Sequence, residues 1–172
     1  YAQIREMRQT RKLESLEELS SIAPTFMTLE DLAERIRRLP GLLSSLVKAS
    51  MGSIHYESAD RRESAYHQFP EDEEERRKRF EYDAEMLETV RSKWEPVCLS
   101  YLSADINLID KPPIHRSVIG YPLFRSEDAT VVYIGYNKVP TTPLDSSIFG
   151  EHEIELLRRV DGILKPVFSK SA

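Results

Sequence analysis

Five residues near the ends of expected strands carry side chains of the kinds that small-molecule sites use. They are Tyr101, Ser103, Asp105, His115 and Arg116. Hydroxyl, carboxylate, imidazole and guanidinium groups at the rim of a mostly apolar pocket orient a ligand through hydrogen bonds and charge. We therefore take these five as candidate ligand-binding residues. The alternative is that they belong to a solvated loop and serve there as caps.

The remaining chemistry-bearing residues form no catalytic or metal motif. The four histidines do not have the spacing of a zinc site, and no P-loop, GxGxxG or GxSxG pattern occurs. Cys98 is the one cysteine, so it can form neither an internal disulfide nor a cysteine-based zinc site. We predict no catalytic and no metal-binding residues, and we expect Cys98 to be a buried, small apolar residue.

Composition indicates one globular domain. The chain has 172 residues, of which 40% are hydrophobic and 31% charged, and its net charge is −5. An acidic chain is not drawn to nucleic acid, so we expect no nucleic-acid contact. The apolar runs are too short for a membrane span, and a single cysteine fits a reducing compartment. We expect a cytoplasmic location, and Tyr1 in place of Met indicates that residues upstream were removed.

The first 27 residues predict a helix. Leu13, Leu16, Leu19, Ile22 and Phe26 step by three and four and so share one face. Two interpretations stay open. The segment 1–27 is a linker or signalling helix that pairs subunits, or it is a frayed N-terminal helix that packs on its own domain, the single domain being residues 13–168.

The rest of the chain predicts helices and strands in the order of an α+β domain. A helix capped by Thr28 ends at Pro40-Gly41, and a short helix covers residues 42–47. Residues 58–65 are expected to form a turn. The remaining elements are strands at 51–57, 66–69 and 97–102, a helix at 70–94, a loop at 103–114, strands at 116–124 and 129–136, a loop at 137–149 and a helix from 151 to about 164. Short hairpin connections in the second half predict a largely antiparallel sheet with helices packed on it.

Four stretches in this order resemble a GAF domain. They are LEDLAERIRRL with KASMGSIHYES, MLETVRSKWEPVCLSYLSAD, SVIGYPLFRSEDATVVYIGYNK and FGEHEIELLRRVDGIL, and together they span most of residues 13–168. The resemblance implies an α+β (α/β three-layer) fold with a central antiparallel sheet of five or six strands. It also implies N- and C-terminal helices on one face and a small-molecule pocket on the other.

Members of the family bind cyclic nucleotides, haem, bilins or other ligands, and the residues fit none of these closely. The cyclic-nucleotide motif is matched in part by Asn137-Lys138, Phe149 and Glu153, which a strand end and a helix cap also explain. The resemblance offers Cys98 for a bilin and three histidines for haem, and simpler structural roles account for each. Methionine-sulfoxide reductases of this fold need a second thiol. The sequence identifies no cofactor.

The sequence thus predicts a non-enzymatic sensory or regulatory domain of a larger signal-transduction protein, such as a sensor histidine kinase of a two-component system. The domain would bind a small molecule or relay a conformational change between its terminal helices. We expect a homodimer formed through these helices. The sequence leaves open whether the parent protein is anchored to a membrane. The alternative is a dimerisation or docking module with no ligand.

Overall fold

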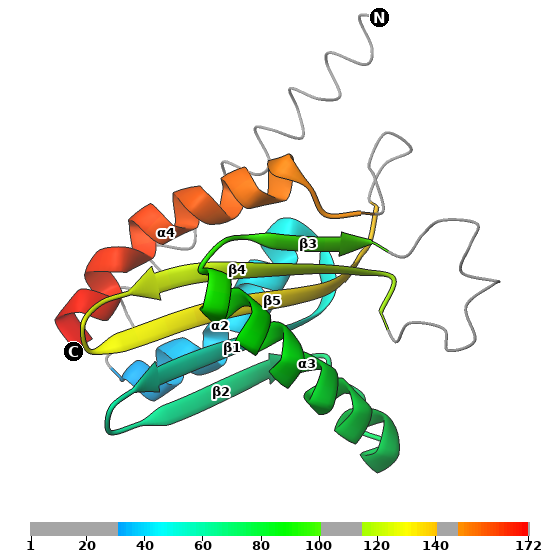
Figure 1. Cartoon of the computed structure of the whole chain (residues 1–172), viewed down its shortest axis with the longest axis horizontal. Helices are drawn as coiled ribbons and strands as arrows, with labels where there is room; N and C mark the ends of the chain where they lie inside the picture. Colours follow the sequence, from blue (N-terminus) through cyan, green and yellow to red (C-terminus); the bar gives the residue numbers. More distant parts are fainter. Residues whose placement is uncertain (1–30, 101–114, 141–147, 172) are drawn as a thin grey trace, which may run out of the picture.

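The computed structural model describes residues 31–100, 115–140 and 148–171 (Figure 1). The expected helix 1–27 and the candidate residues Tyr101, Ser103 and Asp105 lie outside these ranges. Three helices and five strands occur within the described residues. They are α2 (Leu32–Val47), β1 (Ala49–Ser58), β2 (Arg62–His67), α3 (Glu73–Lys93), β3 (Val97–Ser100), β4 (Ser117–Arg125), β5 (Ala129–Lys138) and α4 (Glu151–Ser171).

The strands form one antiparallel sheet in the order β2-β1-β5-β4-β3. Two hairpins, β1–β2 and β4–β5, are joined through the pairing of β1 with β5 at the centre of the sheet. Strands β2 and β3 are the edges. The prediction of a five- or six-stranded antiparallel sheet is therefore confirmed.

Helices cover both faces of the sheet, which gives three layers (Figure 1). α2 and α4 pack on one face, and α3 crosses the other. Successive strand residues point to opposite faces, so in β1 Ile54 and Tyr56 join the core under α2 and α4. Ser53 and His55 point to α3 instead, where both contact Asp83. The predicted three-layer arrangement, with the chain-terminal helices of the domain on one face, is confirmed for α2 and α4.

α2 is one helix, and the prediction that it ends at Pro40-Gly41 is wrong. It begins after Asp31, whose side chain accepts a hydrogen bond from the Ala33 amide at 3.2 Å, and it ends at Lys48 in the left-handed conformation. A proline inside a helix removes one backbone hydrogen bond. Pro40 itself is buried between Leu39 and Leu43, so packing of this helix face holds the helix together across it.

Strand β2 begins at Arg62, whereas the sequence predicted a turn at 58–65 and a strand at 66–69. Its side chains alternate between exposed and half-buried, and backbone pairing with β1 aligns it. The strand therefore lacks the alternating apolar pattern that makes a strand visible in sequence. α4 also extends beyond its predicted end near Leu164, continuing through Pro166 to Ser171.

α3 packs lightly on its face of the sheet. Asp83, Met86 and Val90 are its only buried side chains among the described residues. A Cβ atom on Gly120 of β4 would lie 2.4 Å from Val90 Cγ2, so the absence of a side chain there lets α3 approach the sheet. No helix in the described part of the chain is long and apolar enough to cross a membrane.

Candidate functional site

Asp83 is a carboxylate buried between α3 and the sheet, with 1% of its surface exposed. Its Oδ1 accepts hydrogen bonds from Ser53 Oγ, at 2.6 Å, and from the Tyr136 hydroxyl. Its Oδ2 lies 2.5 Å from His55 Nε2. Both carboxylate oxygens are thus engaged, as a buried charge requires. We call Asp83, Ser53, His55 and Tyr136 the Asp83 cluster.

His55 links the Asp83 cluster to Ser64 at the edge of the sheet. Because a carboxylate only accepts hydrogen bonds, Nε2 of a neutral His55 donates to Asp83, and Nδ1 is then the acceptor. Ser64 Oγ lies 2.7 Å from Nδ1, on the cross-strand partner of His55 in β2. Asp83, His55 and Ser64 therefore form a continuous hydrogen-bonded chain from the protein interior to its surface.

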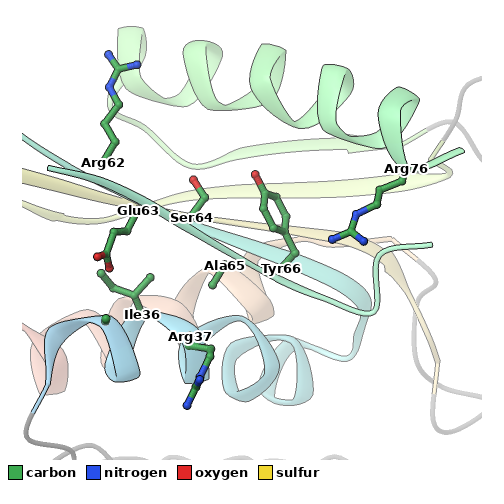
Figure 2. Close-up of a pocket in the computed structure, with 9 residues that line it drawn as sticks. Ile36, Arg37, Arg62, Glu63, Ser64, Ala65, Tyr66 and Arg76 are labelled. Atoms are coloured by element: carbon green, nitrogen blue, oxygen red, sulfur yellow. The ribbon is translucent and has the colours of Figure 1, made fainter. Parts of the chain in front are cut away.

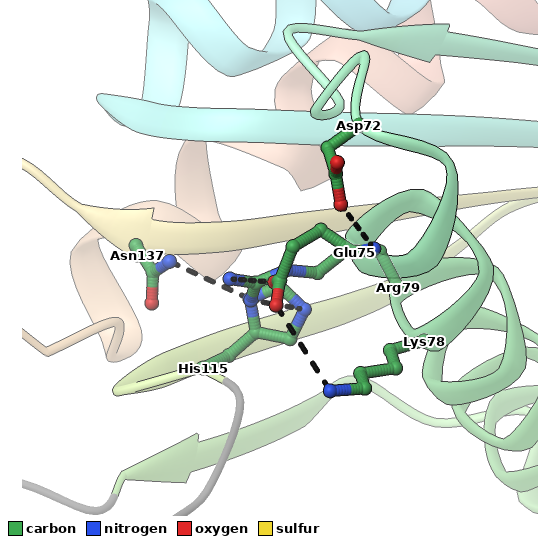
Figure 3. Close-up of polar contacts among 6 residues, drawn as sticks. All are labelled: Asp72, Glu75, Lys78, Arg79, His115 and Asn137. Carbon is green, nitrogen blue, oxygen red and sulfur yellow. Dashed lines mark hydrogen bonds and ion pairs between the residues drawn. The ribbon is translucent and has the colours of Figure 1, made fainter.

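A second polar group surrounds His115, which is fully buried just before β4 (Figure 3). Arg79 Nη1 of α3 donates to His115 Nδ1 at 3.0 Å, and Asn137 Nδ2 of β5 lies 3.4 Å from the same atom. The His115 ring stacks on Tyr136, with ring centres 4.0 Å apart, and packs against Tyr82 in a T-shaped arrangement. We call His115, Arg79, Asn137 and Tyr82 the His115 cluster.

Burial, with the positive charge of Arg79 beside the ring, lowers the pKa of His115 to about 3. The imidazole is therefore neutral at physiological pH, and it positions groups by hydrogen bonds rather than by charge. Tyr136 joins the two clusters, because its ring stacks on His115 and its hydroxyl donates to Asp83. Burial and the charge of Asp83 raise the pKa of Tyr136, so this hydroxyl stays protonated.

The end of β5 connects the His115 cluster to α4. Asn137 adopts the left-handed conformation, with φ 56°, and its Oδ1 accepts a hydrogen bond from the Arg116 amide at 2.8 Å. The next residue, Lys138, forms an ion pair with Glu153 in which each side chain is only 4% exposed. Glu153 also accepts a hydrogen bond from the Gly150 amide at 2.9 Å, which confirms the predicted cap of this helix.

Comparison with solved structures shows which fold this arrangement belongs to. The GAF domain of a protein described as a sensor histidine kinase from Pseudomonas syringae pv. tomato superposes with a TM-score of 0.58 at 14% identity, covering 99% of this chain and 95% of that one. The GAF domain of an Acinetobacter phosphoenolpyruvate-protein phosphotransferase gives 0.56 at 16% identity, covering 90% and 94%. The fold is that of a GAF domain. No family model matches the sequence, and no curated protein matches it significantly.

The GAF fold also occurs in an enzyme. Free methionine-R-sulfoxide reductase from Neisseria meningitidis, solved with its substrate, superposes with a TM-score of 0.59 at 14% identity, covering 91% of this chain and 89% of that one. Identities this low establish the shared fold and leave the chemistry to the residues of each site.

Cys98 bears on this comparison, and the prediction that it is buried is wrong. It is an exposed residue on edge strand β3. Partial burial of its thiol, with the charges of Glu153 and Glu151, raises its pKa to about 11. A thiol that stays protonated is a poor nucleophile, and the sequence holds no second cysteine. Nor do the described residues bring together three His, Cys, Asp or Glu side chains able to hold a metal ion.

The structure places two of the five predicted ligand-binding residues in this GAF fold. His115 lies at the centre of its cluster. Arg116 is exposed, and its backbone amide, rather than its guanidinium, meets Asn137. Tyr101, Ser103 and Asp105 lie outside the described residues, so their part in the site stays a prediction.

Sequence reasoning missed the Asp83 cluster. Asp83 lies in a strongly charged helix, where one more acidic residue attracts no notice. A signal was present nevertheless, because Asp83 shares a helical face with Met86 and Val90, three and seven residues further on. A carboxylate on the apolar face of a helix indicates a buried polar partner.

Proposed function

We propose that this chain is a non-enzymatic sensory or regulatory GAF domain that binds a small molecule at the His115 cluster and relays the binding to α4. The fold supports this, since the comparable structures include the GAF domain of a protein described as a sensor histidine kinase. The single observation that carries the proposal is the step from Asn137 to Lys138. Asn137 belongs to the His115 cluster, and the next residue, Lys138, forms an ion pair with the first turn of α4.

The charges around His115 favour an acidic ligand. Arg79 brings a positive charge to the cluster, and its side chain remains 18% exposed, so part of it is open to solvent. A carboxylate of the same helix, Glu75, lies 3.9 Å from the guanidinium. Neutral His115 adds no repulsion toward an anion, and the aromatic ring of Tyr82 packs beside it. A small carboxylate or phosphate compound is the ligand class that these groups suit.

Relay to α4 follows from the covalent link between neighbouring residues. A ligand that shifts Asn137 also shifts Lys138, since both lie at the end of one strand. If Lys138 and Glu153 separated, each would remain as an unpaired charge in a buried environment, which is costly in free energy. Movement of the strand end is therefore transmitted to the first turn of α4 rather than absorbed between them.

Assembly and context extend the proposal. We infer that the domain pairs with a second copy through its terminal helices, and that it belongs to a cytoplasmic signalling protein such as a sensor histidine kinase. Sedimentation at tens of micromolar tests the pairing, which predicts a dimer. A monomer at that concentration contradicts it.

A thermal-shift screen against small carboxylates, phosphates and nucleotides tests ligand binding. A ligand that binds the folded state raises the melting temperature in proportion to the logarithm of its concentration. We expect a shift of several degrees that is lost in Arg79→Gln. Arg77→Gln is the matched control, because Arg77 lies on the same helix, exposed and paired with Glu81. If no compound in the panel raises the melting temperature and the protein sediments as a dimer, the result would instead support a docking module without ligand.

A further inference from the structure

The hydrogen-bonded chain that ends at Ser64 has the parts of an activated nucleophile. Its Ser64 end lies on edge strand β2, which β1 separates from β5 and the proposed ligand site. Asp83 fixes the His55 ring from inside, through Nε2 at 2.5 Å. The opposite ring nitrogen faces Ser64 Oγ at 2.7 Å. A hydroxyl is a weak nucleophile until a positioned base removes its proton, and a third group that orients the base completes the device.

The exposure of the three residues suits this chemistry. Asp83 and His55 are buried, with 1% and 6% of their surfaces exposed, while Ser64 is exposed on edge strand β2. Ser53 and Tyr136 donate hydrogen bonds to the other oxygen of the Asp83 carboxylate. These two donors fix the carboxylate, and the carboxylate in turn orients the base, His55. Solvent and ligands reach only the serine end of the chain.

Ser64 opens into a groove of about 590 Å³ along the edge of the sheet, between the levels of α2 and α3 (Figure 2). Ser64 and Tyr66 project from β2 to the same side, and Arg76 extends toward them from the start of α3. Burial and the charge of Asp83 raise the pKa of the Tyr66 hydroxyl, and the neighbouring Ser64 and Arg76 offset part of this rise. The hydroxyl therefore stays protonated and can donate to a developing oxyanion.

Three arginines and one carboxylate line this groove, namely Arg37, Arg62, Arg76 and Glu63. Glu63 is paired with Arg61, which lies outside the groove lining. Glu34 pairs with Arg37 and Glu57 with Arg62, whereas Arg76 lies over the ring of Phe80, 5.3 Å from its centre. Arginine side chains at the rim of a groove favour substrates that carry a carboxylate or phosphate. The groove therefore favours anionic compounds as substrates for Ser64.

We propose that Ser64 is a covalent acylation site, which takes the acyl group of an activated ester that carries an anionic group. Ser64 Oγ bonds to the ester carbonyl carbon while its proton passes to His55 Nδ1. The bond between that carbon and the leaving oxygen then breaks, and the proton passes from His55 to the departing alcohol. The products are acyl-Ser64 and one free alcohol, so the step needs no oxidant, metal or further reactant.

Reaction with para-nitrophenyl acetate and mono-para-nitrophenyl adipate tests the proposal in the full chain. Released nitrophenol is followed by absorbance, and the acylated residue is mapped by peptide mass spectrometry. We expect Ser64 to be acylated ahead of the surface lysines, and the adipate ester to react faster than the acetate. Ser64→Ala removes this adduct. Ser100→Ala is the matched control, because Ser100 is an exposed serine on the opposite edge strand.

Asp83→Asn separates a positioned base from a merely exposed serine. The amide of the variant donates to Nε2, which forces the proton of His55 onto Nδ1 and leaves no acceptor for Ser64. The acylation rate at Ser64 should fall on the order of 100-fold, the usual range for general-base assistance. If this variant does not fold, Tyr66→Phe, expected to slow acylation on the order of 100-fold through loss of an oxyanion donor, replaces it. Acylation of Ser64 no faster than of Ser100, or faster reaction of the acetate ester, overturns the proposal.

Discussion

His115 is a neutral histidine among aromatic rings, and this state has a measurable consequence for stability. Its pKa in the folded protein is lowered from 6.5 to about 3. Between these values the unfolded chain binds a proton at this position that the folded chain does not. The free energy of unfolding therefore decreases as pH falls through this window, by up to about 1.4 kcal/mol per pH unit from this residue.

Comparison of the native chain with His115→Gln isolates this contribution from the other groups that titrate in the same range. Urea unfolding at several pH values between 6.5 and 3 gives the slope for each protein. We expect the variant to show a shallower loss of stability on acidification, since glutamine binds no proton. Parallel slopes would mean that His115 titrates with the same pKa in the folded and the unfolded chain, which contradicts a pKa lowered by folding.

At the scale of elements, the ion pair of Lys138 with Glu153 fixes the end of β5 to the start of α4. Glu153→Ala leaves a buried ammonium without its partner, and we expect it to lower the free energy of unfolding by about 3–5 kcal/mol. Lys138→Met combined with Glu153→Met removes both charges and should recover most of this loss. Chemical denaturation measures all three proteins.

An exposed ion pair on the same helix gives the control. Glu155 lies 2.8 Å from Arg158, and both side chains are about half exposed. Glu155→Ala should change stability by less than about 1 kcal/mol, as for other surface pairs. A double Met variant as unstable as Glu153→Ala would show that the loss comes from packing or from the lost cap, rather than from an unpaired charge.

Elements with a clear apolar period could be predicted from sequence, and those held by tertiary contacts could not. The β4–β5 hairpin and α4 were foreseen because their buried side chains recur at the period of a strand and of a helix. β2 was misplaced because backbone pairing with β1, rather than an apolar face, determines where it begins. α2 was divided at Pro40 because local propensity does not include the core that surrounds this proline.

The same distinction explains the candidate site. His115 was found because a histidine and an arginine beside a strand are visible as residue types. Asp83, Ser53 and Tyr136 come from α3, β1 and β5, and only the folded sheet brings them together. The spacing of these residues along the sequence does not predict that their side chains contact one another. The ion pair between Lys138 and Glu153 was missed for the same reason, although both residues were considered.

At the scale of the whole molecule, the two faces of the sheet differ in kind. The face under α2 and α4 is a continuous apolar core, whereas the face under α3 combines a smaller apolar cluster with the Asp83 and His115 clusters. Close packing of apolar side chains on one side gives a rigid frame. Polar groups on the other provide the contacts that a ligand can change, and the end of β5 leads from one face to the other.

Hydrogen exchange of the α4 amides at residues 154–158 tests this connection most directly. Asn137→Gly removes the side-chain contacts to His115 and Arg116 while retaining the left-handed backbone that glycine adopts freely. We predict faster exchange at 154–158 in this variant, unchanged exchange in α2, and no added effect of Asn137→Gly when Lys138→Met and Glu153→Met are already present. Exchange in α4 that does not respond to Asn137→Gly would contradict a relay from the His115 cluster to the terminal helix.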